Sequence, residues 1–534
     1  MFTHLKKMTN TEKKVCILLA GILYKKGIRR VVVSPGSRNT PLIVAFSRQP
    51  GLEVFSVVDE RSAAFIGLGM ARASSQPVAI CCTSGTAALN YGPAVAEAFY
   101  SSVPLIVITA DRPADLVSRR APQTIRQPGI YSGYIKDSTD IECEADSGCF
   151  GEYASERMAA VIDEALQATP GPVHINVQLA APLGRLTEQQ CKETETLGCE
   201  PANELSRLPE TDYCGHTFVF VGTGAHISAN LLERMAALPG TVVFAEGYTG
   251  VTNITNICDN IVTNVDPTLT AGLHCKDAPL PDRVVKIGNS LLSQKYYDIF
   301  DRDAISVNND TALSSLLPGD ANVTDGFKAF WLSCSKEAHK AAREMAVNAR
   351  WSQLVAIHDI LEHSRGCNVQ IGNGMSIRYA QLFDVSHTAG VGCNRGVSGI
   401  DGSASTAIGY AAASDRRTVL IIGDMSLQYD MGALATTFIP DNFTIFVMNN
   451  RGGGIFRYID TTRHLPELEP LISGPVNLPV EGLAEAFGLR YIKADSRQAL
   501  SAALAQAGSS RLIIDVITDS ETDNKVLHKY YNSI

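Results

Sequence analysis

Residues 419–456 read VLIIGDMSLQYDMGALATTFIPDNFTIFVMNNRGGGIF, a pattern from which the fold class follows. An apolar strand ends beside Asp424, a helical run follows, and a second apolar strand ends beside Asn450, before a glycine-rich turn. Strands joined through a helix pair in parallel, so their carboxyl ends share one edge of a sheet, where such folds bind ligands. We therefore expect Asp424 and Asn450 to converge at that edge.

These residues form a set of hard oxygen ligands. The Asp424 carboxylate, the Asn450 amide oxygen and a carbonyl of the Gly452 turn suit Mg²⁺, which completes its octahedron with water and phosphate oxygens. Ser426 lies near the start of the following helix and is a candidate hydrogen-bond donor to a phosphate. The alternative is an ordinary strand-to-helix turn in which Asp424 caps the helix.

The same alternation of short apolar runs and longer helical patterns recurs along the chain and predicts an α/β protein with three doubly wound parallel-sheet domains. The expected strands are Val31–Val33, Val78–Cys82, Leu105–Thr109, Val419–Ile422 and Ile445–Met448. A polar stretch at Thr187–Tyr213 and a charged helical stretch at Ser335–Arg350 are candidate boundaries. The expected domains are residues 1–185, 208–330 and 350–534.

The composition restricts the function. The 534 residues carry a formal net charge of -9, which argues against nonspecific binding to nucleic acid or to an anionic membrane. No window reaches the roughly 18 apolar residues that a membrane span needs, and the first residues lack the apolar core of a signal peptide. We expect a cytoplasmic protein that binds neither nucleic acid nor membrane.

Two local patterns favour structural interpretations. The 13 cysteines contain no CxxC pair, and adjacent Cys81 and Cys82 in one strand should be buried thiols on opposite faces of a sheet. The segment FVFVGTGAHI at 218–227 begins like a dinucleotide-binding turn. It lacks the third glycine of that pattern, so bound NAD or FAD is not expected.

Cations follow several of the expected strands. In an acidic protein, arginines at strand ends are better explained by anionic ligands than by solubility, although any one of them can form a surface ion pair. The arginines in question are Arg38, Arg112, Arg126, Arg378 and Arg395.

The pattern GD-x-S followed by NN resembles the signature of thiamine diphosphate enzymes. The resemblance implies Asp424, Asn450 and the Gly452 carbonyl as ligands of Mg²⁺ or Mn²⁺. It also implies a set of residues that bind the cofactor: Gly423, Asp424, Met425, Ser426, Asn450, Gly452, Ile455 and Phe456. The chain departs from the signature at Met425, where glycine is usual.

Glu60 resembles the activating glutamate of these enzymes. It follows a strand in VFSVVDERSAAF, and a partly desolvated carboxyl group there can hold a proton against the aminopyrimidine ring of the cofactor. The alternative is that Glu60 only starts a helix and interacts with its dipole. Ile400 matches the bulky apolar residue that keeps the cofactor bent, with a core isoleucine as its alternative.

The blocks SPGSR, DER, TSGTA, TADRP, QTIRQPG, NRGVSGIDG, GDMS and NNRGGGIF resemble, in order, those of the 2-succinyl-5-enolpyruvyl-6-hydroxy-3-cyclohexene-1-carboxylate synthases of menaquinone biosynthesis. The match covers most of residues 30–135 and 370–460. It implies decarboxylation of 2-oxoglutarate, with loss of CO2, and addition of the succinyl semialdehyde carbanion to isochorismate. Both substrates are dicarboxylates, which accounts for the arginines.

The same resemblance assigns substrate-binding residues. Arg378 and Arg395 would hold the carboxylates derived from 2-oxoglutarate, and Phe456 and Ile459 would wall the pocket. Isochorismate would be held by Ser37, Arg38, Arg112, Gln123 and Lys295. Two departures stand out, since Gly374 replaces a serine common in the family and the match around Lys295 is loose.

The resemblance also implies a pyrimidine-binding (PYR) domain at 1–185, a central domain at 208–330 and a diphosphate-binding (PP) domain at 350–534. Such enzymes form homodimers or homotetramers with active sites between subunits. Two alternatives remain: another thiamine diphosphate-dependent 2-oxo acid decarboxylase or carboligase, and a noncatalytic nucleotide-binding protein. Joint retention of Glu60, Asp424 and Asn450 argues against the second.

Overall fold

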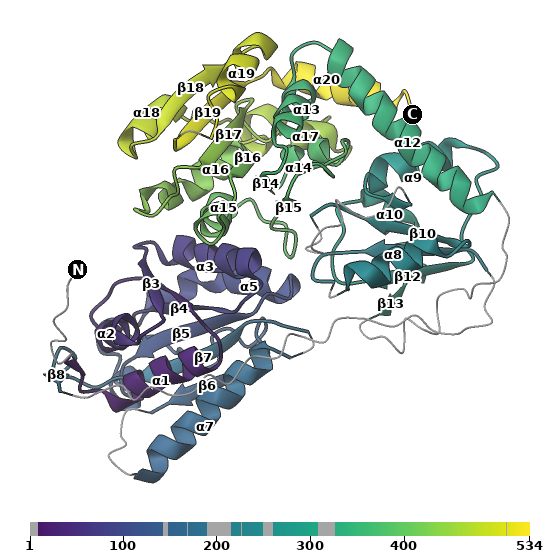
Figure 1. Cartoon of the computed structure of the whole chain (residues 1–534). Helices are drawn as coiled ribbons and strands as arrows, with labels where there is room; N and C mark the ends of the chain where they lie inside the picture. The colour runs from purple at the N-terminus through teal and green to yellow at the C-terminus, as the bar shows by residue number, and fades with distance from the viewer. Residues whose placement is uncertain are drawn as a thin grey trace. The chain divides into compact units, whose positions relative to one another are not determined.

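The computed structural model describes residues 9–142, 148–167, 169–188, 215–225, 227–248, 260–307, 326–508 and 510–534. The described residues form three parallel sheets, each covered by helices (Figure 1). The predicted α/β fold of three domains is therefore confirmed. By internal contacts the chain divides into two compact units, residues 1–203 with 408–414 and 436–438, and residues 204–407 with 415–435 and 439–534.

The first sheet has six strands in the order β3-β2-β4-β5-β7-β6, all parallel. Its strands are β2 Arg30–Val33, β3 Glu53–Ser56, β4 Val78–Cys82, β5 Leu105–Asp111, β6 Ser138–Ile141 and β7 Val173–Gln178. Its helices are α1 Lys14–Lys25, α2 Thr40–Arg48, α3 Glu60–Ser74, α4 Thr86–Asn90, α5 Gly92–Tyr100, α6 Ala114–Ser118 and α7 Gly148–Ala165. A short antiparallel pair, β1 Asn10–Thr11 with β8 Leu186–Thr187, joins the ends of this region.

Cys81 and Cys82 show how the first sheet separates two cores. Cys81 packs with α1, α2 and α7 on one face, and Cys82 packs with α3 and α5 on the other. Both thiols are free and fully buried, as the alternation of strand side chains predicts. The prediction of buried thiols on opposite faces is confirmed.

The central sheet has five parallel strands in the order β11-β10-β9-β12-β13. Its strands are β9 Thr217–Val221, β10 Thr241–Ala245, β11 Ile261–Val262, β12 Arg283–Ile287 and β13 Ile305–Val307. Helices α8 Ala229–Ala237, α9 Val265–His274 and α10 Gln294–Ile299 cover it. The amides of Gly222 and Thr223 donate to the carbonyls of Ile287 and Ser290, so the turn after β9 is bonded to the end of β12 and to the loop that follows it.

The third sheet has six parallel strands in the order β15-β14-β16-β17-β19-β18. Its strands are β14 Asn368–Ile371, β15 Gly390–Gly392, β16 Thr418–Gly423, β17 Phe443–Asn449, β18 Arg490–Ala494 and β19 Leu512–Ile517. Its helices are α13 Gln353–His363, α14 Met375–Ala380, α15 Ser403–Ala412, α16 Asp424–Asp430, α17 Ile455–Tyr458, α18 Val480–Ala486, α19 Arg497–Leu504 and α20 Ser520–Tyr531.

The first and third sheets share one topology. In each, the first strand of the sheet lies between the second and the third. The order in which strands are added across the sheet therefore reverses between β2 and β4, and again between β14 and β16. Ligands of doubly wound folds bind outside the carboxyl ends of the strands at such switch points. The central sheet has its own switch point between β9 and β12.

The predicted boundary at Ser335–Arg350 falls on helix α12, Phe327–Asn348. Phe327 and Trp331 pack in the central core, whereas Ala342 and Ala346 pack in the core of the third sheet. One continuous helix therefore serves both cores. The proposed domain limits at 330 and 350 lie on either side of the midpoint of this helix. The proposed linker at Thr187–Tyr213 falls mainly outside the described residues. The four internal domain limits, at 185, 208, 330 and 350, therefore remain predictions.

Among the described residues, we find no helix with the length and apolar character that crossing a membrane requires.

We predict that Trp331→Ala destabilises the central domain by roughly 3–5 kcal/mol, the usual cost of removing a large buried side chain. Trp331 is fully buried, its ring contacts Phe218 at 5.1 Å between centroids, and its Nε1 donates to Pro279 O at 2.9 Å. Urea unfolding followed by circular dichroism measures the loss. Phe330→Ala, at the neighbouring half-buried ring, is the control, and an equal loss in both variants would contradict the prediction.

Candidate active site

Asp424 and the turn that follows β17 meet at the carboxyl edge of the third sheet. β16 and β17 are adjacent and parallel, with Gly423 opposite Met448. The Asp424 carboxylate accepts a hydrogen bond from Gly452 N at 3.0 Å and another from Met425 N at 2.7 Å. The structure therefore brings Asp424 to the turn that carries Asn450, and their joint role as metal ligands stays a prediction.

The electrostatic state of Asp424 fits a cation ligand. The residue is 1 % exposed, and burial raises the pKa of its carboxyl group to about 6, against backbone hydrogen bonds that lower it. A buried carboxylate is costly unless a positive charge or further donors compensate it. A divalent cation would supply this compensation, as the ligand chemistry predicted from the sequence requires.

The rest of the ligand set lies in the glycine turn. Asn450 is 8 % exposed, and its Nδ2 donates to Asp523 Oδ2 at 3.4 Å, which leaves its amide oxygen available to a metal. Gly452 has φ +141°, and a Cβ there would approach Ser473 O within 2.9 Å, so only glycine fits. The described residues contain no cluster of three His, Cys, Asp or Glu side chains, and this set has a single carboxylate.

Ser426 connects the predicted diphosphate site to Ile400. Its hydroxyl donates to Ile400 O at 2.5 Å, so it would have to leave this carbonyl before donating to a phosphate. Ile400 itself is half-buried and precedes helix α15. The contact fixes the backbone of the residue predicted to keep the cofactor bent.

The predicted apolar wall is on α17 or directly beside it. Ile455 and Phe456 begin this short helix and Ile459 follows it, and all three side chains are only half-buried. The Phe456 ring lies so close to Gly453 that a Cβ there would approach it within 2.7 Å. These side chains therefore remain available to contact a ligand.

Arg378 and Arg395 lie close together near the end of β14. Arg378 Nη1 donates to Gly374 O at 2.8 Å, and Arg395 Nη1 donates to Asn373 Oδ1 at 3.0 Å. Arg395 is 7 % exposed. Burial and the charge of Arg395 lower the pKa of Arg378, so both cations are confined in a region that favours an anion.

Lys295 follows the loop that comes after β12. It is the second residue of α10, half-buried, and its amide donates to Asp266 Oδ1 at 3.2 Å. The preceding residues of the same loop reach Arg395, since Arg395 Nη2 donates to Leu291 O at 3.4 Å. The structure therefore brings the loop that carries Lys295 to Arg395.

Glu60 is the first residue of α3 and is half-buried. The N-cap of this helix is Asp59, whose side chain accepts hydrogen bonds from the amides of Arg61 and Ser62. The capping role is thus filled by the neighbouring residue. The carboxyl group of Glu60 is not needed for it.

Four of the five predicted isochorismate residues lie at the carboxyl edge of the first sheet. Ser37 and Arg38 follow β2, and Arg112 follows β5. Arg38 is 8 % exposed and its Nη1 donates to Leu179 O at 2.6 Å, whereas Ser37 is exposed. Gln123 is also exposed, has φ +58°, and its Nε2 donates to Ser84 O at 3.2 Å.

A buried polar network supports this edge, and sequence reasoning missed it. Gln127 is fully buried, accepts from Gly85 N at 2.9 Å and donates to Asn176 Oδ1 at 3.0 Å. Asn176 in turn donates to Asp111 Oδ2 at 3.0 Å. Burial raises the pKa of Asp111, against the hydrogen bond from Asn176. The QTIRQPG block contained the signal, since Gln127 belongs to it.

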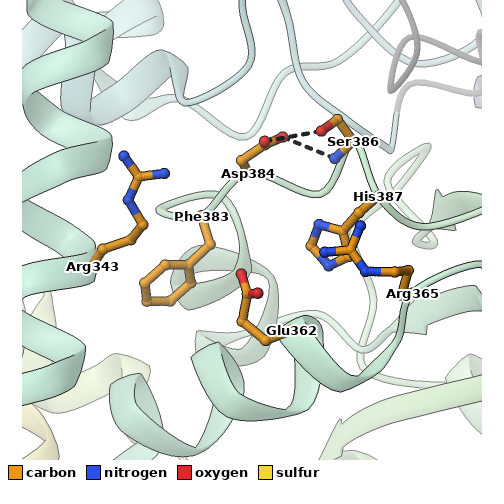
Figure 2. A pocket seen from close by; sticks show the side chains of 7 residues that line it. All are labelled: Arg343, Glu362, Arg365, Phe383, Asp384, Ser386 and His387. Atoms are coloured by element: carbon orange, nitrogen blue, oxygen red, sulfur yellow. Dashed lines mark hydrogen bonds between the residues drawn. The ribbon is translucent and has the colours of Figure 1, made fainter.

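A separate cavity of about 230 Å³ lies at the opposite edge of the third sheet. Figure 2 shows its lining, in which the Asp384 carboxylate bonds to Ser386. Arg365 and His387 precede β14 and β15, so this cavity is at the amino ends of these strands. Because doubly wound folds bind ligands at the carboxyl ends, we do not assign the cavity to the active site.

Two comparisons with known proteins agree with this geometry. Residues 13–130 match the family "Thiamine pyrophosphate enzyme, N-terminal TPP binding domain", and residues 372–516 match "Thiamine pyrophosphate enzyme, C-terminal TPP binding domain". The first match includes strands β2 to β5 of the first sheet, and the second includes β15 to β18 and most of β19 of the third. The fold and this site therefore define a thiamine diphosphate-dependent enzyme.

Curated relatives narrow the family. A protein of Porphyromonas gingivalis is 33% identical over 98% of this chain and 98% of its own length, and one of Cytophaga hutchinsonii is 32% identical over 96% and 97%. A third, of Flavobacterium psychrophilum, is 31% identical over 95% and 96%. All three are named 2-succinyl-5-enolpyruvyl-6-hydroxy-3-cyclohexene-1-carboxylate synthase. The chain belongs to this family.

Proposed function

We propose that the protein decarboxylates 2-oxoglutarate and joins the four-carbon product to isochorismate, giving 2-succinyl-5-enolpyruvyl-6-hydroxy-3-cyclohexene-1-carboxylate and CO2 in menaquinone biosynthesis. The observation that carries the proposal is the pair Arg378 and Arg395, which lies near the end of β14, beside the strand that leads into Asp424. Two guanidinium groups in a largely buried place match a substrate with two carboxylates.

The metal and diphosphate would be held by one edge of the third sheet. Asp424, Asn450 and the Gly452 carbonyl would bind Mg²⁺ or Mn²⁺, and the backbone from Gly423 to Ser426 would face the diphosphate. Ile455 and Phe456 would contact the cofactor. When bound, thiamine diphosphate supplies the carbon nucleophile and the electron sink for decarboxylation.

The remaining chemistry falls to residues of this chain. Glu60 would hold a proton against the aminopyrimidine nitrogen, and Ile400 would support the bent shape of the cofactor. Phe456 and Ile459 would exclude water from the reacting carbon, which limits its unwanted protonation. Arg378 and Arg395 would orient 2-oxoglutarate through its carboxylates.

Isochorismate would be bound by a second group of cations and donors. Ser37, Arg38, Arg112 and Gln123 share one sheet edge, and the charge of Arg38 partly opposes the rise that burial causes in the pKa of Asp111. Lys295 is the fifth member of this group and comes from the central domain. Its place on the loop that reaches Arg395 supports the assignment.

We further infer that the protein acts as a homodimer or homotetramer with active sites between subunits, as the family resemblance implies. We also infer a cytoplasmic location, as expected from the sequence patterns. Sedimentation velocity of the protein with cofactor and Mg²⁺ would distinguish the two assemblies, and a monomer under these conditions would contradict both.

We predict that the enzyme prefers 2-oxoglutarate to pyruvate and that Arg395→Ala narrows this preference, whereas Arg378→Ala lowers kcat/KM for both acids. Pyruvate lacks the distal carboxylate and leaves one guanidinium unpaired, and a charge-assisted hydrogen bond contributes roughly 1.5–3 kcal/mol. Losing it should therefore lower kcat/KM on the order of 10–100-fold.

The measurement compares kcat/KM for both acids in the wild type and both variants, with isochorismate as acceptor. Arg490→Ala is a matched control, since Arg490 is an exposed arginine of the third sheet whose guanidinium donates to Ser510 Oγ and Gln506 Oε1. If neither active-site variant changes the ratio of kcat/KM for 2-oxoglutarate to kcat/KM for pyruvate, these arginines do not bind the distal carboxylate. Wild-type preference for pyruvate would favour another decarboxylase or carboligase of the same class.

A further inference from the structure

Glu246 is a buried carboxylate of the central domain that neither motif nor resemblance assigns. It directly follows β10 and is fully buried, and both of its carboxylate oxygens accept hydrogen bonds from one loop. Oε2 accepts from Leu292 N at 2.7 Å, and Oε1 accepts from Ser293 N at 3.1 Å. The Tyr248 hydroxyl also donates to Oε2. These bonds fix the position of residues 289–293.

The loop at 289–293 follows β12, at the switch point of the central sheet. In many doubly wound proteins this place binds a ligand. Here the loop reaches Arg395 of the PP domain instead. Leu291 O accepts from Arg395 Nη2 at 3.4 Å, and the Ser290 hydroxyl donates to Arg395 O.

Further contacts make this support rigid. Ser290 N donates to Thr223 Oγ1 at 3.2 Å, and the Ser293 hydroxyl donates to Asp266 Oδ1 at 2.6 Å. On its other side, Arg395 Nη1 is held by Asn373. The guanidinium is therefore fixed between the central loop and the turn after β14.

Glu246 and Arg395 also interact through their charges. Burial raises the pKa of Glu246 to about 7, whereas hydrogen bonds from Tyr248 and Leu292 and the charge of Arg395 lower it. Arg395 thus stabilises the ionised form of Glu246. By the same interaction, ionised Glu246 stabilises the buried cation of Arg395.

We propose that Glu246 is a positioning residue for recognition of the 2-oxo acid, acting through the loop at 289–293 to hold Arg395 where it binds a substrate carboxylate. The inference rests on the proposed role of Arg395. It gives the central domain a part in the reaction, because the central sheet at its switch point supports a substrate-binding residue of the neighbouring domain.

The test uses the full chain with thiamine diphosphate, Mg²⁺ and isochorismate. Glu246→Gln removes the negative charge. It also places an NH2 group against the backbone amide of Leu292 or Ser293, both of which now donate a hydrogen bond to Glu246. We expect the KM for 2-oxoglutarate to rise about tenfold, with a smaller change in kcat, because the Arg395 guanidinium is displaced from the substrate carboxylate that it would bind. The KM for pyruvate and the calorimetric affinity for thiamine diphosphate should change less than about twofold, since neither depends on pairing with Arg395.

A double-mutant cycle separates positioning from general damage. If Glu246 acts through Arg395, the double variant Glu246→Gln with Arg395→Ala should have the same KM for 2-oxoglutarate as Arg395→Ala alone. Asn264→Ala is the matched control, since Asn264 is a fully buried polar residue of the central domain that bonds to Ser335 and Thr268. It should lower Tm and leave both KM values in place.

Each outcome has a defined meaning. An unchanged KM in Glu246→Gln with a raised KM in Arg395→Ala overturns this inference alone, as do fully additive effects in the cycle. An unchanged KM in Arg395→Ala overturns the role of that arginine and this inference with it. Failure of the wild type to consume isochorismate with 2-oxoglutarate overturns the proposed function itself.

A second variant covers the case in which Glu246→Gln does not fold. Ser290→Ala leaves Glu246 in place and removes the hydroxyl that bonds to Arg395 O. We expect a rise in the KM for 2-oxoglutarate of roughly two- to tenfold, the range of one neutral hydrogen bond. No rise in this variant would count against the inference.

Discussion

Glu60→Gln should keep the fold and most of the cofactor affinity but lower kcat on the order of 10²–10⁴-fold, the contribution typical of general acid-base catalysis. Glutamine preserves shape at the start of α3, and Asp59 continues to cap the helix. The carboxyl proton that Glu60 would offer to the aminopyrimidine nitrogen is lost. Binding and shape are therefore retained while activation is removed.

Proton exchange at the thiazolium carbon, followed by quenched-flow NMR, measures this activation directly. Glu97→Gln is the control, because Glu97 is a buried carboxylate of the same domain whose partners are Arg72 at 2.9 Å and Ser101 at 2.7 Å. That variant should lose stability and retain the exchange rate. A wild-type exchange rate in Glu60→Gln would remove Glu60 from the mechanism.

Asp424→Ala should abolish binding of thiamine diphosphate in the presence of Mg²⁺. Asp424 is the only carboxylate of the proposed ligand set, and without it the metal and the diphosphate are poorly neutralised. Substitution of a residue that merely orients a metal ligand commonly weakens binding about 10–100-fold. Loss of a charged ligand should exceed that range.

Calorimetric titration of the variant with thiamine diphosphate and Mg²⁺ measures the loss. Asp430→Ala is the matched control, since Asp430 is a fully buried carboxylate at the other end of α16 that accepts from Ser405 N and Oγ, both at 2.7 Å. It should lower Tm with little effect on cofactor affinity. If Asp424→Ala binds thiamine diphosphate as tightly as the wild type does, Asp424 is not a ligand of the metal.

Much of the fold could be predicted because the signals are local. Apolar runs at Val31–Val33 and Val419–Ile422 fall within β2 and β16, since a buried parallel strand must be apolar on both faces. The opposite burial of Cys81 and Cys82 follows from the two-residue period of a strand. The limits of the domains stay predictions, because helix α12 packs in two cores and offers no change in local structure to mark a boundary.

The candidate site divides in the same way. The sequence alone determined that Asp424 and Asn450 follow neighbouring parallel strands, and parallel strands present their carboxyl ends at one edge. Motif resemblance added the roles of Glu60, Arg378 and Arg395, which stay proposals. These inferences need only the order of elements and the residues at their ends.

Only the tertiary structure decided which groups hold these residues in place. Glu246 bonds to the amides of Leu292 and Ser293, and that loop bonds to Arg395 more than a hundred residues further along the chain. Gln127 similarly joins Gly85 to Asn176. No spacing or periodicity encodes such partners, because a buried polar group is satisfied by whatever donor or acceptor packing brings to it, at any distance in sequence.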